Sequence, residues 1–302
     1  MSGVSRRVRL IRTQVDRFQR ALHGAERGDA GSLHRARVAT RRLREIVPLL
    51  QLPGGTAHKL SRRLRAVTAR LGSVREYDVL LALVDELHGK RRASGDALAR
   101  VGMAVARDRD EAREQALERL RIDDMHRLAR KLRSLADDLD PETVRNARAV
   151  RWALEARIAR RAAKLGEALR DAGAVYLPER LHAARIAAKK LRYVLEVAGD
   201  ESDARVRADL ALLKRVQDAL GRMHDLQVLI DHVRAVQATL APPNVTVWRA
   251  LDSLIRLLDD DCRRLHARYM KARPGLELMA QRLSARTPKP GTRNALPEQV
   301  AG

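Results

Sequence analysis

The segment 33–44 reads LHRARVATRRLR, and a second copy at 181–192 reads LHAARIAAKKLR, 148 positions later. Apolar residues recur every three or four positions in both copies, which is the spacing of one buried face of an α-helix. A further pair, LGSVREYDVL at 71–80 and LGRMHDLQVL at 220–229, recurs at an offset of 149. Two independent matches at nearly one offset predict that the chain is a tandem duplication of a helical unit.

The helical pattern continues through the rest of the chain. Apolar residues keep helical spacing, runs of β-branched residues are absent, and Gly or Pro separates the periodic stretches. We predict an all-α protein of about ten or eleven helices, whose halves 5–138 and 141–272 form two pseudo-symmetric antiparallel bundles. One predicted helix break falls at Gly221, and the last helix is predicted to end near residue 272. The segment 274–302 carries four prolines and is predicted to be a partly disordered tail.

The chain of 302 residues is strongly basic, with 61 Lys and Arg against 38 Asp and Glu and a formal net charge of +23. Nine of the 61 are lysines and 52 are arginines, and the planar guanidinium of arginine binds phosphate oxygens through two parallel hydrogen bonds. Codon preference in a G+C-rich genome is an alternative explanation of the Arg excess, although not of the net charge. The charge indicates an anionic partner and argues against an acidic metal-binding protein.

Composition also excludes several classes of protein. The single cysteine, Cys262, leaves no disulfide framework and no CxxC-type zinc site, and it fits a reducing cytoplasm. The N-terminus is charged every few residues and no run of about 18 apolar residues occurs, so we expect neither export nor a membrane span. Aromatic residues make up only 2% of the chain, too few for the base-stacking surface that single-stranded nucleic-acid binders use.

Each copy of the first motif places a ladder of basic residues along one helix face. In each copy, four side chains lie within an arc of about 80° around the helix and span a rise of roughly 15 Å along its axis. This length suits a chain of phosphates better than one small anion. The first ladder and its counterpart are His34, Arg37, Arg41 and Arg44, and His182, Arg185, Lys189 and Arg192. Arg42 and Lys190 lie off this arc and can reach it only from its flank.

A row of basic residues on a helix is usually a solvated face, and this interpretation stays open here. Two observations favour a binding site. The apolar positions of the helix lie directly beside the ladder and not opposite it. Cations three, four or seven positions apart repel each other, and the chain keeps this unfavourable pattern twice. For His34 and His182, a neutral hydrogen-bonded ring near a helix start and a donor to phosphate are both open interpretations.

In the second motif, Gly72 and Gly221 mark either a helix break or a close approach of two helices. Arg75 and His224 are candidate members of the anion site, and Arg65 matches Lys214 at the offset of 149. Four acids are candidate salt-bridge partners of the ladders: Glu76, Asp78, Asp218 and Asp225.

No catalytic machinery is visible in the sequence. It contains no phosphate-binding glycine loop, no HExxH motif and no pair of clustered carboxylates in an apolar setting. The acidic run at 259–261 is interpreted as a solvated face, because three adjacent acids fan around a helix. We therefore expect no enzyme activity, no cofactor and no bound metal.

The two motif pairs resemble the signature helices of the CHAD domain, the conserved histidine α-helical domain, over about residues 5–272. The resemblance implies two pseudo-symmetric helical bundles that bind inorganic polyphosphate on a basic surface. Family members are often fused to a CYTH triphosphatase domain, whose acidic strand motif is absent here, so a stand-alone binding module is expected. Two positions depart from the pattern, since Glu45 aligns with Tyr193 and Gln227 with Asp78. Unequal binding by the two halves is therefore left open.

We expect a non-enzymatic, cytoplasmic protein that binds inorganic polyphosphate, with association with polyphosphate granules as a further expectation. The first alternative is a nonspecific nucleic-acid-binding protein, because counterion release favours binding to any polyanion. The second is a phosphohydrolase acting on polyphosphate. The candidate binding residues are basic and lie in or beside the motifs: His34, Arg37, Arg41, Arg42, Arg44, Arg65, Arg75, His182, Arg185, Lys189, Lys190, Arg192, Lys214 and His224.

Overall fold

The computed structural model describes residues 6–27, 29–50, 52, 55–70, 73–119, 122–138, 144–198, 203–240 and 244–285. Within these ranges the chain forms ten α-helices and one short 3-10 helix, η1, and no β-strand, so the predicted all-α class is confirmed. The helices of the first half are α1 (Arg6–Glu26), α2 (Ala30–Ile46), η1 (Val47–Leu50), α3 (Thr56–Arg70), α4 (Ser73–Gly89), α5 (Gly95–Arg119) and α6 (Ile122–Asp137). Those of the second half are α7 (Val144–Ala172), α8 (Pro178–Ala198), α9 (Ala204–Ala238) and α10 (Val245–Ser284).

The second half repeats the first with fewer interruptions. In chain order, α7 and α8 correspond to α1 and α2, the single helix α9 corresponds to α3 and α4, and α10 corresponds to α5 and α6. The predicted break at Gly221 is wrong, because α9 runs unbroken through it. A Cβ at this position would lie 3.8 Å from Nε of Arg185, which is an ordinary contact. Packing along the whole of α9 outweighs the small helix-destabilising effect of one glycine.

The predicted helix end near residue 272 is also wrong, since α10 continues through Pro274. Leu276 and Leu283 lie two helical turns apart and are almost fully buried in the second half. Their burial stabilises the helix beyond the proline, against the backbone hydrogen bond that the proline removes. The remainder of the predicted tail, from residue 286 onward, lies outside the described residues.

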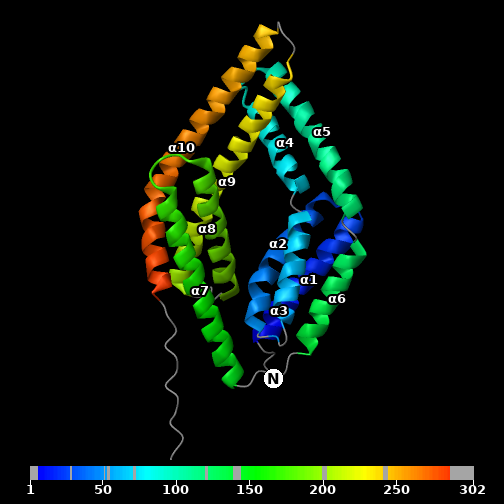
Figure 1. The fold of residues 1–302 in the computed structure, drawn as a ribbon, viewed down its shortest axis with the longest axis vertical. Coiled ribbons are helices and arrows are strands. Elements are labelled where there is room, and N and C mark those ends of the chain that lie inside the picture. Colours follow the sequence, from blue (N-terminus) through cyan, green and yellow to red (C-terminus); the bar gives the residue numbers. More distant parts are fainter. Residues whose placement is uncertain are drawn as a thin grey trace, which may run out of the picture.

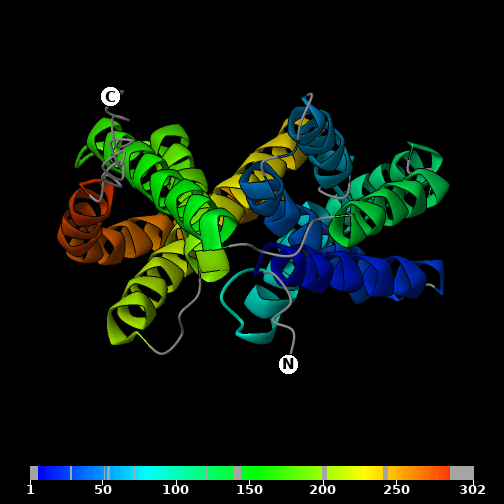
Figure 2. The same cartoon turned by 90° about the horizontal axis from the view of Figure 1, so that it is seen from below.

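Three buried apolar clusters hold the helices together. The first lies among α1, α2, η1, α3 and α6 and also includes Leu154 of α7 and Val194 and Val197 of α8. The second lies among α7, α8, the first part of α9 and the last part of α10. The third lies among α4, α5, the last part of α9 and the first part of α10, so both halves build it. We name this third unit the shared bundle. It forms the top of the molecule in Figure 1, and Figure 2 shows the two halves on opposite sides when seen from below.

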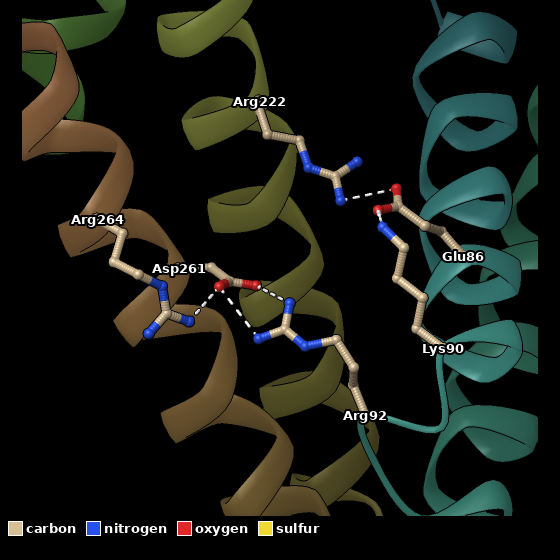
Figure 3. Close-up of polar contacts among 6 residues, drawn as sticks. All are labelled: Glu86, Lys90, Arg92, Arg222, Asp261 and Arg264. Atoms are coloured by element: carbon tan, nitrogen blue, oxygen red, sulfur yellow. Dashed lines mark hydrogen bonds and ion pairs between the residues drawn. The ribbon is translucent and has the colours of Figure 1, made fainter.

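Ion pairs between the halves reinforce the shared bundle. Figure 3 shows two carboxylates that each bind two cations: Glu86 with Arg222 and Lys90, and Asp261 with Arg92 and Arg264. Nη2 of Arg222 lies 2.8 Å from Oε2 of Glu86, which joins α9 to α4. Nη1 of Arg92 lies 2.6 Å from Oδ2 of Asp261, which joins the α4–α5 turn to α10. Asp261, a member of the acidic run at 259–261, therefore joins the two halves, whereas the sequence predicts a solvated face for this run.

Candidate functional site

The positive charge of the chain is unevenly distributed over the fold. The segments of the shared bundle, 73–119 and 222–264, contain 15 Lys and Arg against 16 Asp and Glu, a balance of −1. The net charge of +23 therefore comes from the rest of the chain. Because a polyanion is attracted to concentrated positive charge, its site is expected on the helices outside the shared bundle and where the two halves meet there.

Four ladder residues come together where α2 lies against α8, and we name them the central cluster: Arg37, Arg41, Arg185 and Lys189. The pKa of Lys189 is lowered to about 7, first by burial and then by the charges of the three arginines. Two of those arginines are on α2, whereas Lys189 is on α8. The two ladders, which the sequence places on corresponding helix faces, therefore face each other in the structure.

Two carboxylates border the central cluster, Asp225 on α9 and Glu76 on α4. Oδ1 of Asp225 lies 4.0 Å from Nη2 of Arg185. Burial lowers the pKa of Arg185 and raises the pKa of Asp225, so both groups are partly withdrawn from water. Nε of Arg185 is buried without a hydrogen-bond partner among the described residues. The cluster thus combines an excess of cations with a buried donor that an anion could satisfy.

The predicted histidines of the second half form a pair beside the central cluster. The Nδ1 atoms of His182 and His224 lie 3.3 Å apart, and the ring centroids are 4.5 Å apart. Burial, followed by the charge of Arg185, lowers the pKa of His224 to about 4, and burial also lowers the pKa of His182. Both rings are therefore neutral at pH 7, where one Nδ1 can donate to the other. A bound anion would favour their protonated forms.

The corresponding positions of the first half are His34 and Arg75. His34 is exposed on α2, about one turn before Arg37 and on the same helix face. The side chain of Arg75 lies outside the described residues, so its place in the site stays a prediction.

A second basic surface joins α2, α3, α7 and α8, and we name it the α3–α7 flank: Arg44, Arg65, Arg161 and Lys190. The pKa of Arg44 is lowered by burial and then by the charge of Arg65. The pKa of Lys190 is lowered by burial and then by the charges of Arg161 and Arg44. The flank therefore holds several cations that repel each other across the junction of the two halves.

Glu45 lies beside this flank and was not connected with the site by sequence reasoning. Its side chain is 8% exposed and accepts hydrogen bonds from Nε of Arg157 at 2.9 Å and from Nη2 of Arg161 at 3.0 Å. Glu45 therefore holds two arginines of α7 against α2 through charge-assisted hydrogen bonds. In the sequence, Glu45 stands where the second half has Tyr193. The signal that could have connected it with the site is the presence of Arg157 and Arg161 one turn apart on a predicted helix, which suggests a shared acidic partner.

A third basic surface surrounds a pocket of about 580 Å³ between α1 and α2 of the first half and α8 and α9 of the second. We name it the α1–α9 flank, and its charged residues are Arg17, Arg42, Arg192, Lys214 and Glu196. Nη2 of Arg42 donates to Oε2 of Glu196 at 3.0 Å, and Nε of Arg192 lies 3.3 Å from Oε1 of the same carboxylate. One acid therefore compensates two of the four cations on this flank.

The model of the CHAD domain family matches residues 9–234, which is most of the chain. The chain belongs to the CHAD domain family. Among solved structures, PptA from Streptomyces chartreusis is 20% identical with a TM-score of 0.64, and the match covers 88% of this chain and 97% of that one. The CHAD domain from the plant Ricinus communis is 25% identical with a TM-score of 0.56, with 87% and 91% covered. Comparison with curated proteins gives no match.

The first motif pair of this CHAD protein lies on α2 and α8, and its basic residues do not form two continuous strips. The middle members of each ladder meet at the central cluster, whereas Arg44 and Arg192 lie on opposite flanks. Under the repeat, Arg42 corresponds to Lys190, Arg44 to Arg192 and Arg65 to Lys214. The two flanks of the CHAD domain are therefore equivalent surfaces related by the duplication.

Of the four acids expected to pair with the CHAD ladders, Asp225 and Glu76 border the central cluster. Asp218 instead lines a separate pocket with Arg215 and Arg268, and Asp78 is exposed. Within the described ranges, no group of three or more His, Cys, Asp or Glu side chains is placed to hold a metal ion. A search of the same residues finds no helix with the length and apolar character needed to cross a membrane.

Proposed function

We propose that this CHAD protein binds inorganic polyphosphate, with the central cluster as its main contact. The proposal rests on Lys189, a partly buried amine among three arginines whose charges help to lower its pKa to about 7. Cations in this arrangement repel each other in the free protein. A chain of phosphates placed among them would replace that repulsion by attraction and would offer acceptors to the buried donors.

The extent of the basic surface supports a long ligand. The central cluster continues into both flanks, and one ladder alone has a rise of roughly 15 Å along its helix, which several consecutive phosphates can follow. Arginine predominates, and its fork of donors matches two phosphate oxygens at once. The shared bundle, with its balanced charge, offers no comparable attraction to a polyanion.

Burial of the site favours polyphosphate over duplex nucleic acid. The side chain of Arg185 is 14% exposed, so a ligand must enter between the helices to contact it. Polyphosphate is a flexible single chain, whereas duplex DNA is stiff over about 150 base pairs and carries its phosphates on a wide cylinder. Nonspecific nucleic-acid binding through the outer arginines remains the competing function, because the net charge supports it.

We further propose that binding leaves the phosphoanhydride bonds intact. Phosphoryl transfer normally uses metal ions held by carboxylates. The carboxylates at the described site, Asp225, Glu76, Glu45 and Glu196, each lie close to basic side chains of the site. Their arrangement supports a role in balancing and orienting cations.

A competition titration tests the function. The protein is titrated with fluorescent long-chain polyphosphate, and then with duplex DNA of matched total charge, at about 0.15 M salt. We expect polyphosphate to bind at least about tenfold more tightly, a difference of about 1.4 kcal/mol. Equal or tighter binding of DNA would favour the nucleic-acid-binding alternative.

We also propose a cytoplasmic location on polyphosphate granules, which follows from the proposed ligand. A fluorescent fusion should co-localise with granules and become diffuse in cells that make no polyphosphate. A diffuse signal in both kinds of cell would remove this part of the proposal.

A further inference from the structure

The two flanks are equivalent in the duplication but differ in how their cations are paired. On the α1–α9 flank, Arg42 and Arg192 both contact Glu196, which is 25% exposed. On the α3–α7 flank, the equivalents of these arginines are Lys190 and Arg44. Neither forms an ion pair with an acid of the described residues. The difference originates in one position, because the residue equivalent to Glu196 in the first half is Pro48.

The α3–α7 flank also receives cations that the other flank lacks. Arg161 and Lys164 of α7 both help to lower the pKa of Lys190, after burial as the main cause. The equivalent positions on α1 are Thr13, which lines the α1–α9 flank, and Asp16, which pairs with Arg133 of α6. α7 therefore adds two cations to one flank, whereas α1 adds one, Arg17, to the other, where the equivalent residue on α7 is Leu165.

The acid on the α3–α7 flank does not remove this imbalance. Glu45 is buried, and both of its oxygens are engaged with Arg157 and Arg161 of α7. The charge of Glu45 raises the pKa of Arg44 and of Lys190, but neither these two cations nor Arg65, all shared with the other flank by the repeat, form an ion pair with it. They are therefore available to an anion, whereas an anion on the α1–α9 flank must compete with Glu196 for two of its cations.

We propose that polyphosphate is held asymmetrically, running from the central cluster over the α3–α7 flank, and that Glu196 largely closes the α1–α9 flank to it. This inference rests on the proposed function. Glu196 acts here as a specificity-determining residue, since it occupies the arginines that would otherwise bind phosphate. The internal duplication has thus produced one flank that binds polyphosphate strongly and one that binds it weakly.

Two matched double variants test the asymmetry. Arg65→Gln with Lys190→Gln removes one Arg and one Lys from the α3–α7 flank, and Lys214→Gln with Arg42→Gln removes the equivalent pair from the α1–α9 flank. Each charge-assisted contact is worth about tenfold in affinity. We expect the first variant to weaken polyphosphate binding about a hundredfold, with a salt slope lower by about 2. The second should weaken binding about tenfold or less, since Arg42 is already paired.

A third arm examines Glu196 itself. Glu196→Gln should tighten polyphosphate binding. When Lys214 and Arg42 are replaced by Gln in the Glu196→Gln protein, the loss of affinity should be about as large as the loss from replacing Arg65 and Lys190 in the wild type. Circular dichroism and the unfolding temperature confirm that each variant is folded. Equal losses from the two double variants in the wild-type background, or a cost at the α1–α9 flank that does not change with Glu196→Gln, would overturn the asymmetry. A wild-type protein that fails to bind polyphosphate would overturn the proposed function itself.

Discussion

Polyphosphate binding should weaken as the pH rises above 7, because the central cluster binds phosphate best when Lys189 is charged. The groups that lie near Lys189 are the arginines of the cluster on α2 and α8, the carboxylate of Asp225 on α9, and the rings of His182 and His224. With a pKa of about 7, only about one tenth of Lys189 is protonated at pH 8 in the free protein. A bound phosphate chain adds negative charge and moves the pKa back towards its ordinary value of 10.5.

The size of the effect follows from linkage. Binding should take up about 0.9 proton at pH 8 and about 0.5 proton at pH 7, and affinity should fall about tenfold between pH 8 and pH 9. Affinity falls with rising pH because the pKa of Lys189 is higher in the complex than in the free protein, so the complex holds more protons than the separate protein and ligand. Below pH 6 the histidine pair adds further uptake, since the pKa of His224 in the free protein is about 4.

Isothermal titration calorimetry measures this uptake directly. The titration is repeated at pH 8 in Tris and in HEPES, and the difference in observed enthalpy gives the number of protons bound. Long chains are used because their terminal phosphates, with a pKa near 6, are then a small fraction of the ligand. Lys189→Arg keeps the charge but cannot titrate in this range, so its uptake at pH 8 should be near zero. Uptake near zero in the wild type, or equal uptake in Lys189→Arg, would refute the reasoning.

Replacement of three ladder cations by Gln should weaken polyphosphate binding more than about tenfold and flatten its salt dependence, while an equally charged change on α5 should have little effect. The ladder triples are Arg37, Arg41 and Arg44, and Arg185, Lys189 and Arg192, and the control triple is Arg107, Arg109 and Arg113. Equal losses would show that overall charge explains binding. Polyphosphate incubated with the protein and Mg²⁺ or Mn²⁺ should keep its length on a gel, and shortening that disappears in Asp225→Asn would contradict binding without cleavage. Leu229→Ala should lower the free energy of unfolding by about 2–5 kcal/mol in urea titrations, because Leu229 is fully buried in the shared bundle. A loss below about 1 kcal/mol would show that this bundle is loosely packed.

The repeat was the most informative feature of the sequence because one offset, seen in two motifs, relates the helices of the two halves. It predicts that α2 and α8 are equivalent and that their basic faces correspond. The helical wheel could not show that each ladder divides between a central cluster and a flank. A wheel gives the direction of a side chain from its own helix, whereas α3, α7 and α9 decide what that side chain meets.

Gly221 illustrates a second limit of the sequence. The Leu-Gly pair of the motif occurs in both halves, yet α9 continues through Gly221 while α3 ends at Arg70 and α4 begins at Ser73. Helix propensity differs little between the two motifs, so the outcome depends on the surrounding packing. Residues of α9 on both sides of Gly221, Leu220 and Met223, are buried and support a continuous helix.

Glu45 and Glu196 were missed for a related reason. Both lie one turn or less beyond the end of a ladder, where a carboxylate looks like an ordinary surface residue. Each has a partner in the other half of the chain, Arg157 at 112 positions from Glu45 and Arg42 at 154 positions from Glu196. Pairing over such distances depends on how the halves are docked, which local sequence patterns do not report.

The shared bundle makes the two halves depend on each other. Each half contributes one helical hairpin to it, and neither hairpin can bury its apolar face without the other. Two copies of a single half, placed in the same arrangement, would form a closed two-fold dimer with interlocked hairpins. The present chain is in this sense a dimer whose subunits have been joined end to end. Once joined, the two subunits no longer had to share one sequence, and an acid could be fixed at Glu45 in one and at Glu196 in the other.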